Sequence, residues 1–228
     1  MSTTCQDNMS TENACTSETY KENLEFWDRA WNAVKKPYTQ MPDLQYLDTI
    51  VDYLKEKAAE HVLDLGCGSG WLAILLARNG FEVTGLDVAT HAIELARMWA
   101  DQETLSIQFD IGDIGDLNYP NGFFDAVVAN SIFEHLNFAL AERTLARIKN
   151  QLIPGGAFIG AFDNVGGGAG EYYELQDGSH IYTDKGRKGM LLRRYSTEEL
   201  QQLFADWTIT KLEELDNGTR LLCAHTKH

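Results

Sequence analysis

The segment HVLDLGCGSG, residues 61–70, constrains the fold of this chain more than any other stretch. Its first half, VLDL, is apolar apart from Asp64, which is the pattern of a buried parallel strand. Alternating glycines follow, and then the apolar helical pattern WLAILLAR of residues 71–78. A strand, a glycine turn and a helix in this order expose backbone N–H groups and let a ligand approach the main chain closely.

The spacing of the glycines indicates which ligand. A dinucleotide-binding turn reads G-x-G-x-x-G, so after Gly66 and Gly68 its third glycine would stand at position 71. That position is Trp71, the third glycine is Gly70, and an acid stands two residues before the first glycine, at Asp64. This D-x-G-x-G-x-G form resembles motif I of the class I S-adenosylmethionine (SAM) methyltransferases. The resemblance implies that the acid and the glycine backbone hold the amino acid end of SAM, whose ammonium a carboxylate attracts.

A second acid follows the next predicted strand, FEVTGLD, residues 81–87. Asp87 stands 17 residues after Gly70, at the expected carboxyl end of that strand. An acid there is placed to accept hydrogen bonds from ribose hydroxyls, although helix capping and turn formation are alternative roles. We therefore expect Asp87 to bind the ribose, with Val88 and Cys67 beside the cofactor.

A third acid is expected to bind the adenine. The run DIGDLNYPNGFFD, from Asp113 to Asp125, resembles the family's D-A-x-x-L-P-F-x-x-x-x-F-D stretch and keeps its spacing. That resemblance implies that Asp113 accepts a hydrogen bond from the adenine amino group and that the Ile114 backbone meets the ring. Asp110 and Asp116 are nearby acids that only spacing distinguishes from Asp113, and a solvated loop acid is the alternative for all three.

The fourth predicted strand, FDAVVAN, residues 124–130, is followed by Glu134-His135-Leu136. The family resemblance places the backbone at Asn130 near the methionine end of SAM, and a similar E-H-L/V triplet recurs in the family. His135 is a candidate general base, because an unperturbed imidazole titrates near neutral pH. The alternative is that its ring orders the cofactor loop, since methyl transfer to a nucleophilic nitrogen or sulfur needs no strong base.

Aromatic residues precede the glycine turn. Trp27 and Trp31 stand four positions apart and share one face of a helix, where they either pack on the core or cover the cofactor. The segment KPYTQMP, residues 36–42, breaks the helix at both prolines and holds Tyr38 on a loop. Trp27 and Tyr38 are the predicted cofactor contacts in this region.

Residues 165–195 are too long for a simple connection and are predicted to be an insert that shapes the substrate pocket. Lys or Arg occupies five of the ten positions from 185 to 194, and none of the ten is acidic. This basic run is either a solvated edge or a site for a carboxylate or phosphate on an anionic methyl acceptor. The candidate acceptor-binding residues are Tyr173, His180, Arg187 and Arg193.

Composition limits the function classes. A net charge of −15 argues against a general nucleic-acid binder, because phosphate contacts need a basic surface. No apolar run approaches the ~20 residues of a membrane span, and the N-terminus lacks a signal pattern, so we expect a cytoplasmic protein with no membrane contact. The four cysteines are widely spaced and lack a nearby His set, so no metal site is expected.

Together these patterns predict an α/β, Rossmann-like, doubly wound sheet of seven strands. It should be mostly parallel, with one antiparallel strand contributed by a C-terminal hairpin that turns at Asp216-Asn217-Gly218. We expect a disordered tail over 1–18, a helical cap over 19–60 and a SAM-dependent methyltransferase domain over 61–228.

The resemblance implies methyl transfer from SAM to a small molecule by in-line displacement, with S-adenosylhomocysteine as product. Two alternatives stay open: a non-catalytic protein that binds SAM or S-adenosylhomocysteine, and a SAM-type enzyme of other chemistry such as aminopropyl transfer. A nicotinamide dehydrogenase is disfavoured by Trp71. The acceptor atom and the oligomeric state do not follow from the sequence.

Overall fold

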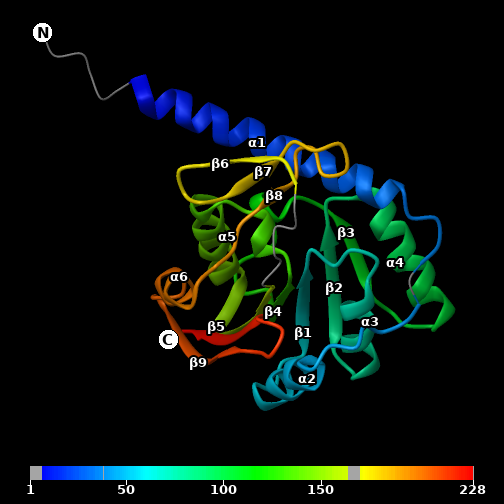
Figure 1. Ribbon diagram of the computed structural model, residues 1–228. Helices are drawn as coiled ribbons and strands as arrows, with labels where there is room; N and C mark the ends of the chain where they lie inside the picture. Colours follow the sequence, from blue (N-terminus) through cyan, green and yellow to red (C-terminus); the bar gives the residue numbers. More distant parts are fainter. Residues whose placement is uncertain (1–6, 38, 164–169, 228) are drawn as a thin grey trace, which may run out of the picture.

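The computed structural model describes residues 7–37, 39–163 and 170–227. Its centre is a seven-stranded sheet of order β3-β2-β1-β4-β5-β10-β9 (Figure 1). The strands are β1 (His61–Leu65), β2 (Glu82–Asp87), β3 (Gln108–Ile111), β4 (Phe124–Asn130), β5 (Leu152–Phe162), β9 (Trp207–Glu214) and β10 (Arg220–Thr226). β10 is antiparallel to both of its neighbours, and the other pairs are parallel. This confirms the predicted doubly wound sheet with one antiparallel strand.

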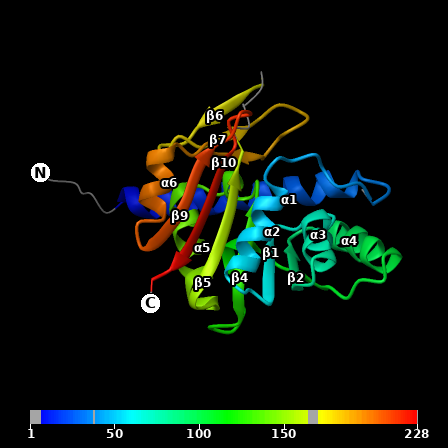
Figure 2. The ribbon, with the colours of Figure 1, turned by 90° about the horizontal axis from the view of Figure 1, so that it is seen from below.

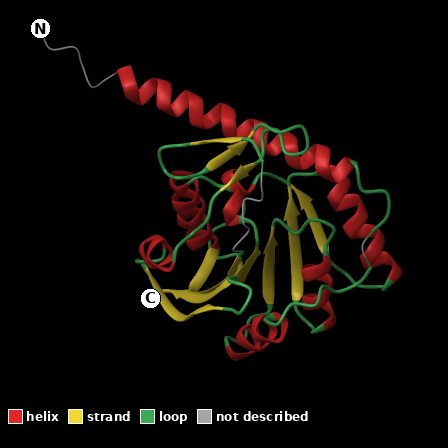
Figure 3. Cartoon of the chain, in the orientation of Figure 1, coloured by secondary structure: helices red, strands yellow, loops and turns green. Residues whose placement is uncertain are grey.

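Helices cover both faces of this sheet (Figures 2 and 3). One face packs against α2 (Leu47–Glu56), α3 (Trp71–Arg78) and α4 (Thr90–Gln102), and the other against α5 (Phe138–Gln151) and α6 (Thr197–Leu203). Successive strand residues therefore enter opposite cores: Val62 packs with the first group of helices and Leu63 with the second. Burial on both faces explains why these strands are continuous apolar runs in the sequence.

The first helix, α1 (Asp7–Asn32), crosses the end of the sheet toward which β1, β2 and β3 point (Figure 3). Residues 7–18, which the sequence places in a disordered tail, belong to this helix in the structure. The polar segment has little to bury, but it continues a helix whose second half is anchored on the protein. Extending an existing helix costs far less than nucleating one.

The insert forms a second, smaller sheet that the sequence analysis did not anticipate. Its strands are β6 (Tyr172–Glu174), β7 (His180–Tyr182) and β8 (Leu191–Leu192), paired antiparallel. β8 contacts both α1 and a 3₁₀ helix, η2 (Phe133–His135), which follows β4. Strands of two or three residues are too short to produce a visible alternation, which explains why the sequence predicts an insert but not this sheet.

Within the described ranges, none of the helices combines the length and the apolar character that crossing a bilayer would demand.

Candidate functional site

A cavity lies between α1 and the carboxyl ends of the central strands. Its empty volume is about 700 Å³, counting the part open to solvent, which suits a cofactor-sized ligand. Eight of the predicted site residues line it, although they come from segments far apart in the sequence: Trp27, Gly66, Gly68, Asp87, Val88, Asp113, Ile114 and His135. In open α/β sheets this edge is where ligands bind.

The three glycines of the turn serve two different purposes. Gly66 and Gly68 line the cavity at φ +69° and +51°, and a Cβ on Gly68 would lie 2.7 Å from the Trp31 ring of α1. Gly70, at φ +87°, does not line the cavity. A Cβ there would lie 2.8 Å from the Ala96 Cβ, so this glycine allows α3 to pack closely on α4. Gly70, a predicted cofactor contact, is therefore not brought to the cavity, and its contacts give it a packing role.

A pair of glycine substitutions tests this assignment. Gly70 and Gly80 have almost the same φ, +87° and +90°, but a Cβ on Gly80 would meet nothing within 4 Å. Both Gly→Ala changes introduce strain of about 1–2 kcal/mol for an alanine at positive φ, and Gly70→Ala adds about 1–3 kcal/mol of overpacking. Urea unfolding should therefore show the larger loss of stability for Gly70→Ala. Equal losses for the two variants would contradict the packing role.

Asp87 holds the glycine turn from the end of β2. Its carboxylate accepts hydrogen bonds from the Gly68 N–H at 2.8 Å and from the Ala89 N–H at 2.9 Å. Burial raises the pKa of Asp87, and these backbone donors act in the opposite direction. The carboxylate therefore fixes the turn while it faces the cavity, beside Val88.

Asp64 and Cys67 lie beneath the turn and do not line the cavity. Asp64 is buried in β1, and its Oδ2 has no hydrogen-bond partner among the described residues. Burial raises the pKa of Asp64 to about 7, against a backbone hydrogen bond from Ala73. Burial also raises the pKa of the Cys67 thiol, whose sulfur packs toward Gly85. The side chain of Cys67, a predicted cofactor contact, therefore enters the core under the turn and leaves only the backbone of this residue to meet a cofactor.

Asp113 is the one of the three candidate acids that lines the cavity. Its Oδ1 accepts hydrogen bonds from the Gly115 N–H at 2.7 Å and from the Tyr20 hydroxyl of α1. Asp110 instead accepts from side chains beside it on the sheet edge, and Asp116 pairs with an arginine of α5. The spacing argument therefore selected the acid that reaches the cavity.

His135 is held rigidly in the wall of the cavity. Its Nδ1 lies 2.9 Å from the Leu191 carbonyl oxygen of β8, so Nδ1 carries the proton and donates. The ring also meets the Trp27 ring edge-on, with 4.5 Å between centroids. Burial lowers the pKa of His135 to about 4, although the bond to Leu191 opposes this shift. At neutral pH the ring is therefore uncharged and weakly basic, which favours the alternative in which it orders the cofactor loop.

Asn23, which the sequence analysis missed, fastens α1 to this wall. Its side chain is 1% exposed. The amide nitrogen donates to the His135 carbonyl at 3.0 Å, and the amide oxygen accepts from the Leu191 N–H at 3.0 Å. Its position in the sequence could have indicated this role. Tyr20, Asn23 and Trp27 are spaced so that they share one face of the helix, and all three line the cavity.

The four predicted acceptor-binding residues of the insert do not line the cavity. Arg193 is 5% exposed, and its guanidinium pairs with Asp177 and with Glu199 of α6. The prediction that Arg193 binds an acceptor anion is therefore at odds with its contacts. A buried guanidinium takes internal carboxylates as partners, and this arginine ties the insert to α6.

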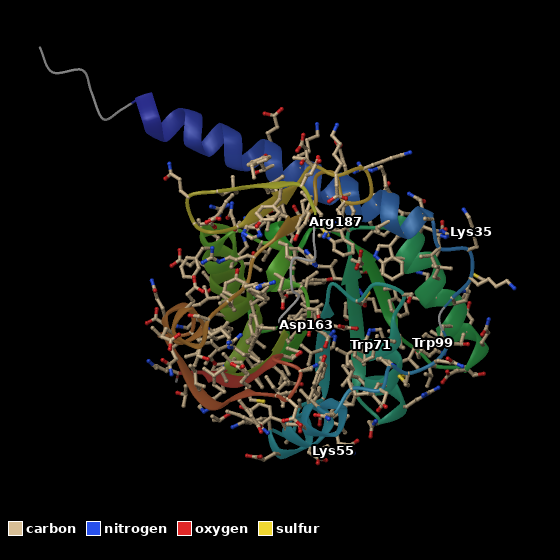
Figure 4. All side chains as sticks on the ribbon, viewed as in Figure 1. Lys35, Lys55, Trp71, Trp99, Asp163 and Arg187 are labelled. Atoms are coloured by element: carbon tan, nitrogen blue, oxygen red, sulfur yellow. The ribbon has the colours of Figure 1, made fainter. Side chains whose placement is uncertain are left out.

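Of the other three, Tyr173 and His180 lie on strands of the small sheet, and Arg187 lies in the connection between β7 and β8. Arg187 pairs with Asp184 at 2.9 Å and stacks over the Tyr182 ring, and Figure 4 shows it next to α1. His180 stacks on a neighbouring tyrosine ring at 4.1 Å, and Tyr173 is 45% exposed. These contacts place the basic run of the insert outside the cavity.

Two further predicted contacts remain. Tyr38 lies outside the described residues. Asn130 ends β4 without lining the cavity, and its side-chain oxygen accepts from the Tyr46 hydroxyl at 2.7 Å. The next residue, Ser131, does line the cavity. Among the residues that the structure describes, no group of three or more His, Cys, Asp or Glu side chains is arranged to hold a metal ion.

Comparisons with known proteins agree with this geometry. A family model described as a methyltransferase domain matches residues 62–156. The chain is 37% identical to a demethylmenaquinone methyltransferase of Thermus thermophilus over 119 residues. This aligned segment covers 51% of this chain and 53% of that protein. It is 31% identical over 165 residues to a ubiquinone biosynthesis O-methyltransferase of Xanthomonas campestris, covering 66% and 68%. The chain thus spans about half the length of the Thermus relative.

A solved structure shows the same fold. An S-adenosylmethionine-dependent methyltransferase of Clostridium acetobutylicum superposes with a TM-score of 0.67 at 16% identity, covering 82% of this chain and 94% of that one. The Xanthomonas relative, at 31% identity over two thirds of its length, adds sequence similarity to this shared fold. The chain therefore belongs to the class I SAM-dependent methyltransferases, a family of enzymes whose cofactor is SAM.

Proposed function

We propose that this protein transfers a methyl group from SAM to a small-molecule acceptor by in-line displacement. The observation that carries the proposal is the single cavity that gathers the glycine turn, Asp87 and Asp113 at the carboxyl edge of the sheet. Each is what the family pattern assigns to one part of SAM, and they reach the cavity from the carboxyl ends of three different strands, β1, β2 and β3.

The residues present suit that cofactor. Asp87 offers a carboxylate to ribose hydroxyls, and Asp113 offers one to an adenine amino group beside Ile114. Gly66 and Gly68 provide a side-chain-free cradle for the amino acid end. The unpartnered oxygen of Asp64, buried beneath the cradle, supplies negative charge on the side where an ammonium would lie.

SAM supplies the electrophilic methyl group on its sulfonium. The protein positions the reactants and excludes water. Trp31 of α1 covers the glycine turn, Trp27 lines the cavity beside His135, and Asn23 holds that helix against β8. Holding two reactants in line accounts for much of the rate of such a displacement. The two relatives are named for quinone pathways, which favours a small cyclic acceptor over a macromolecule.

Isothermal titration with SAM, S-adenosylhomocysteine and NAD tests the proposal. We expect both SAM compounds to bind and NAD to give no heat, because Trp71 stands where a dinucleotide turn has its third glycine. Labelled SAM with a panel of hydroxyl, thiol and amine acceptors then reports transfer. Binding of NAD alone would overturn the proposal. Binding of SAM without transfer to any acceptor would favour a non-catalytic binding protein. In a further titration with decarboxylated SAM, tighter binding of that compound than of SAM would favour aminopropyl transfer.

A further inference from the structure

A cluster of polar side chains lies beside the cavity, at the carboxyl ends of β4 and β5. The Ser131 hydroxyl, in the cavity wall, donates to Asp163 Oδ2 at 2.5 Å, and Thr219 donates to Asp163 Oδ1 at 3.0 Å. Asn130 connects Ser131 to the hydroxyl of Tyr46 through bonds of 3.2 and 2.7 Å. Figure 4 shows Asp163 near the middle of the molecule, away from the surface helices.

Glu134 brings a second carboxyl group to this cluster. It is 1% exposed, and its Oε1 accepts a hydrogen bond from the Asp163 N–H. Its Oε2 is buried and has no hydrogen-bond partner in the part of the chain that the structure describes. Buried polar atoms are almost always satisfied, so an orphaned carboxyl oxygen next to a ligand cavity indicates a missing donor.

One residue of the cluster, Tyr46, borders a second hollow. Tyr46 lines it together with residues 43–45 and 215–217, and its empty volume is about 640 Å³, again including open solvent. Ser131 lies on the cavity side of the cluster and Tyr46 on the side of this hollow. The hydrogen-bonded chain of Tyr46, Asn130 and Ser131 therefore runs from the second hollow to the cofactor cavity.

We propose that this cluster is the subsite for the methyl acceptor, that the acceptor presents a neutral hydroxyl group to it, and that Glu134 accepts the hydroxyl proton. The inference rests on the proposed function. As the methyl group is transferred, the O–H bond breaks and its proton passes to Oε2 of Glu134. The oxygen–carbon bond forms, the sulfur–carbon bond breaks, and neutral S-adenosylhomocysteine leaves.

Charge around the cluster argues for a hydroxyl over an anionic group. Glu134 and Asp163 would repel a carboxylate or phosphate, and the Arg193 guanidinium is directed to Asp177 and Glu199. The other titratable groups that face Glu134 are the hydroxyls of Tyr46 and Tyr195. The earlier expectation of an anionic acceptor is not supported by these contacts.

The environment also tunes Glu134 for this task. Burial, with a smaller contribution from the neighbouring Asp163 carboxylate, raises the pKa of Glu134 to about 8, against two backbone hydrogen bonds. A proton acceptor with a pKa near the working pH is well matched to general base catalysis. Because the carboxylate is the active form, the rate of transfer should increase with pH up to about 8.

The test uses hydroquinone and catechol as hydroxyl probes, with thiophenol and aniline as acceptors that lack a hydroxyl. We expect both diols to bind the wild-type complex with S-adenosylhomocysteine. The Glu134→Gln variant should lower kcat for the diols by about 100-fold or more and remove the rise of rate with pH. Asp163→Asn should raise KM because it disturbs acceptor orientation. Glu142→Gln, an exposed acid on α5, is the matched control and should change neither value.

Titration of SAM into each variant separates this inference from the proposed function. Glu134→Gln should keep the SAM affinity of the wild type, which also shows that the variant is folded. Wild-type protein that binds no SAM would overturn the proposed function. Normal SAM binding would overturn only the acceptor subsite if neither diol bound, if thiophenol or aniline alone were methylated, or if Glu134→Gln kept the kcat and pH profile of the wild type.

Discussion

Replacing Asp87 with alanine is expected to weaken SAM binding by about 100-fold or more, equivalent to about 2.7 kcal/mol. The substitution removes a charged acceptor for ribose hydroxyls, and each such hydrogen bond contributes about 1.5–3 kcal/mol. It also leaves the Gly68 and Ala89 N–H groups without their acceptor, so the hydrogen bonds that fix the conformation of the glycine turn are lost. Isothermal titration of SAM into the purified variant measures the loss.

Asp110→Ala is the matched control for this measurement. Asp110 stands on the neighbouring strand β3, and its carboxylate accepts from Gln108 and Tyr119 instead of lining the cavity. Its SAM affinity should equal that of the wild type. Equal losses in the two variants would indicate a general effect of removing acids from this edge, and an unchanged affinity in Asp87→Ala would remove Asp87 from the binding site.

Replacing Asn23 with alanine is expected to lower the free energy of unfolding by about 2–4 kcal/mol, because two buried backbone groups lose their partners. Those groups are the His135 carbonyl and the Leu191 N–H, each 3.0 Å from the Asn23 amide. Urea unfolding followed by circular dichroism measures the change.

The chain supplies its own control on the same helix. Asn32 of α1 is exposed, and its side-chain amide donates to Asp28 one turn earlier, so Asn32→Ala should change stability by less than about 0.5 kcal/mol. A loss for Asn23→Ala no larger than that of the control would show that α1 is held mainly by its apolar contacts.

The sheet and the cofactor side of the cavity were predictable because they are encoded locally. Buried parallel strands are apolar runs, and the glycine turn and the acids after β2 and β3 stand at fixed distances along the chain. Spacing alone selected Asp113 from three nearby acids, and the structure brings that one to the cavity. Fixed spacing works here because each acid follows directly from the end of its own strand.

The roles of the residues around the insert and the proposed acceptor subsite could not be predicted from local spacing. Whether Arg193 meets a ligand or the carboxylates of Asp177 and Glu199 depends on how the insert folds back, which no local pattern encodes. Asn23 looks like any polar residue of an exposed helix until β8 and η2 are brought against it. Glu134 directly precedes His135, the candidate base that the sequence indicated. That Oε2 of Glu134 has no partner among the described residues becomes evident only from the three-dimensional packing.

The bonds around Leu191 have a consequence for how this protein can change. Asn23 accepts a hydrogen bond from the backbone N–H of Leu191, and His135 donates one to its backbone carbonyl. Neither bond involves the side chain at position 191. These two hydrogen bonds therefore do not depend on which side chains the insert carries. An insert of another length and composition can be exchanged for this one while α1 stays closed, provided that it still presents an extended, buried residue at that point.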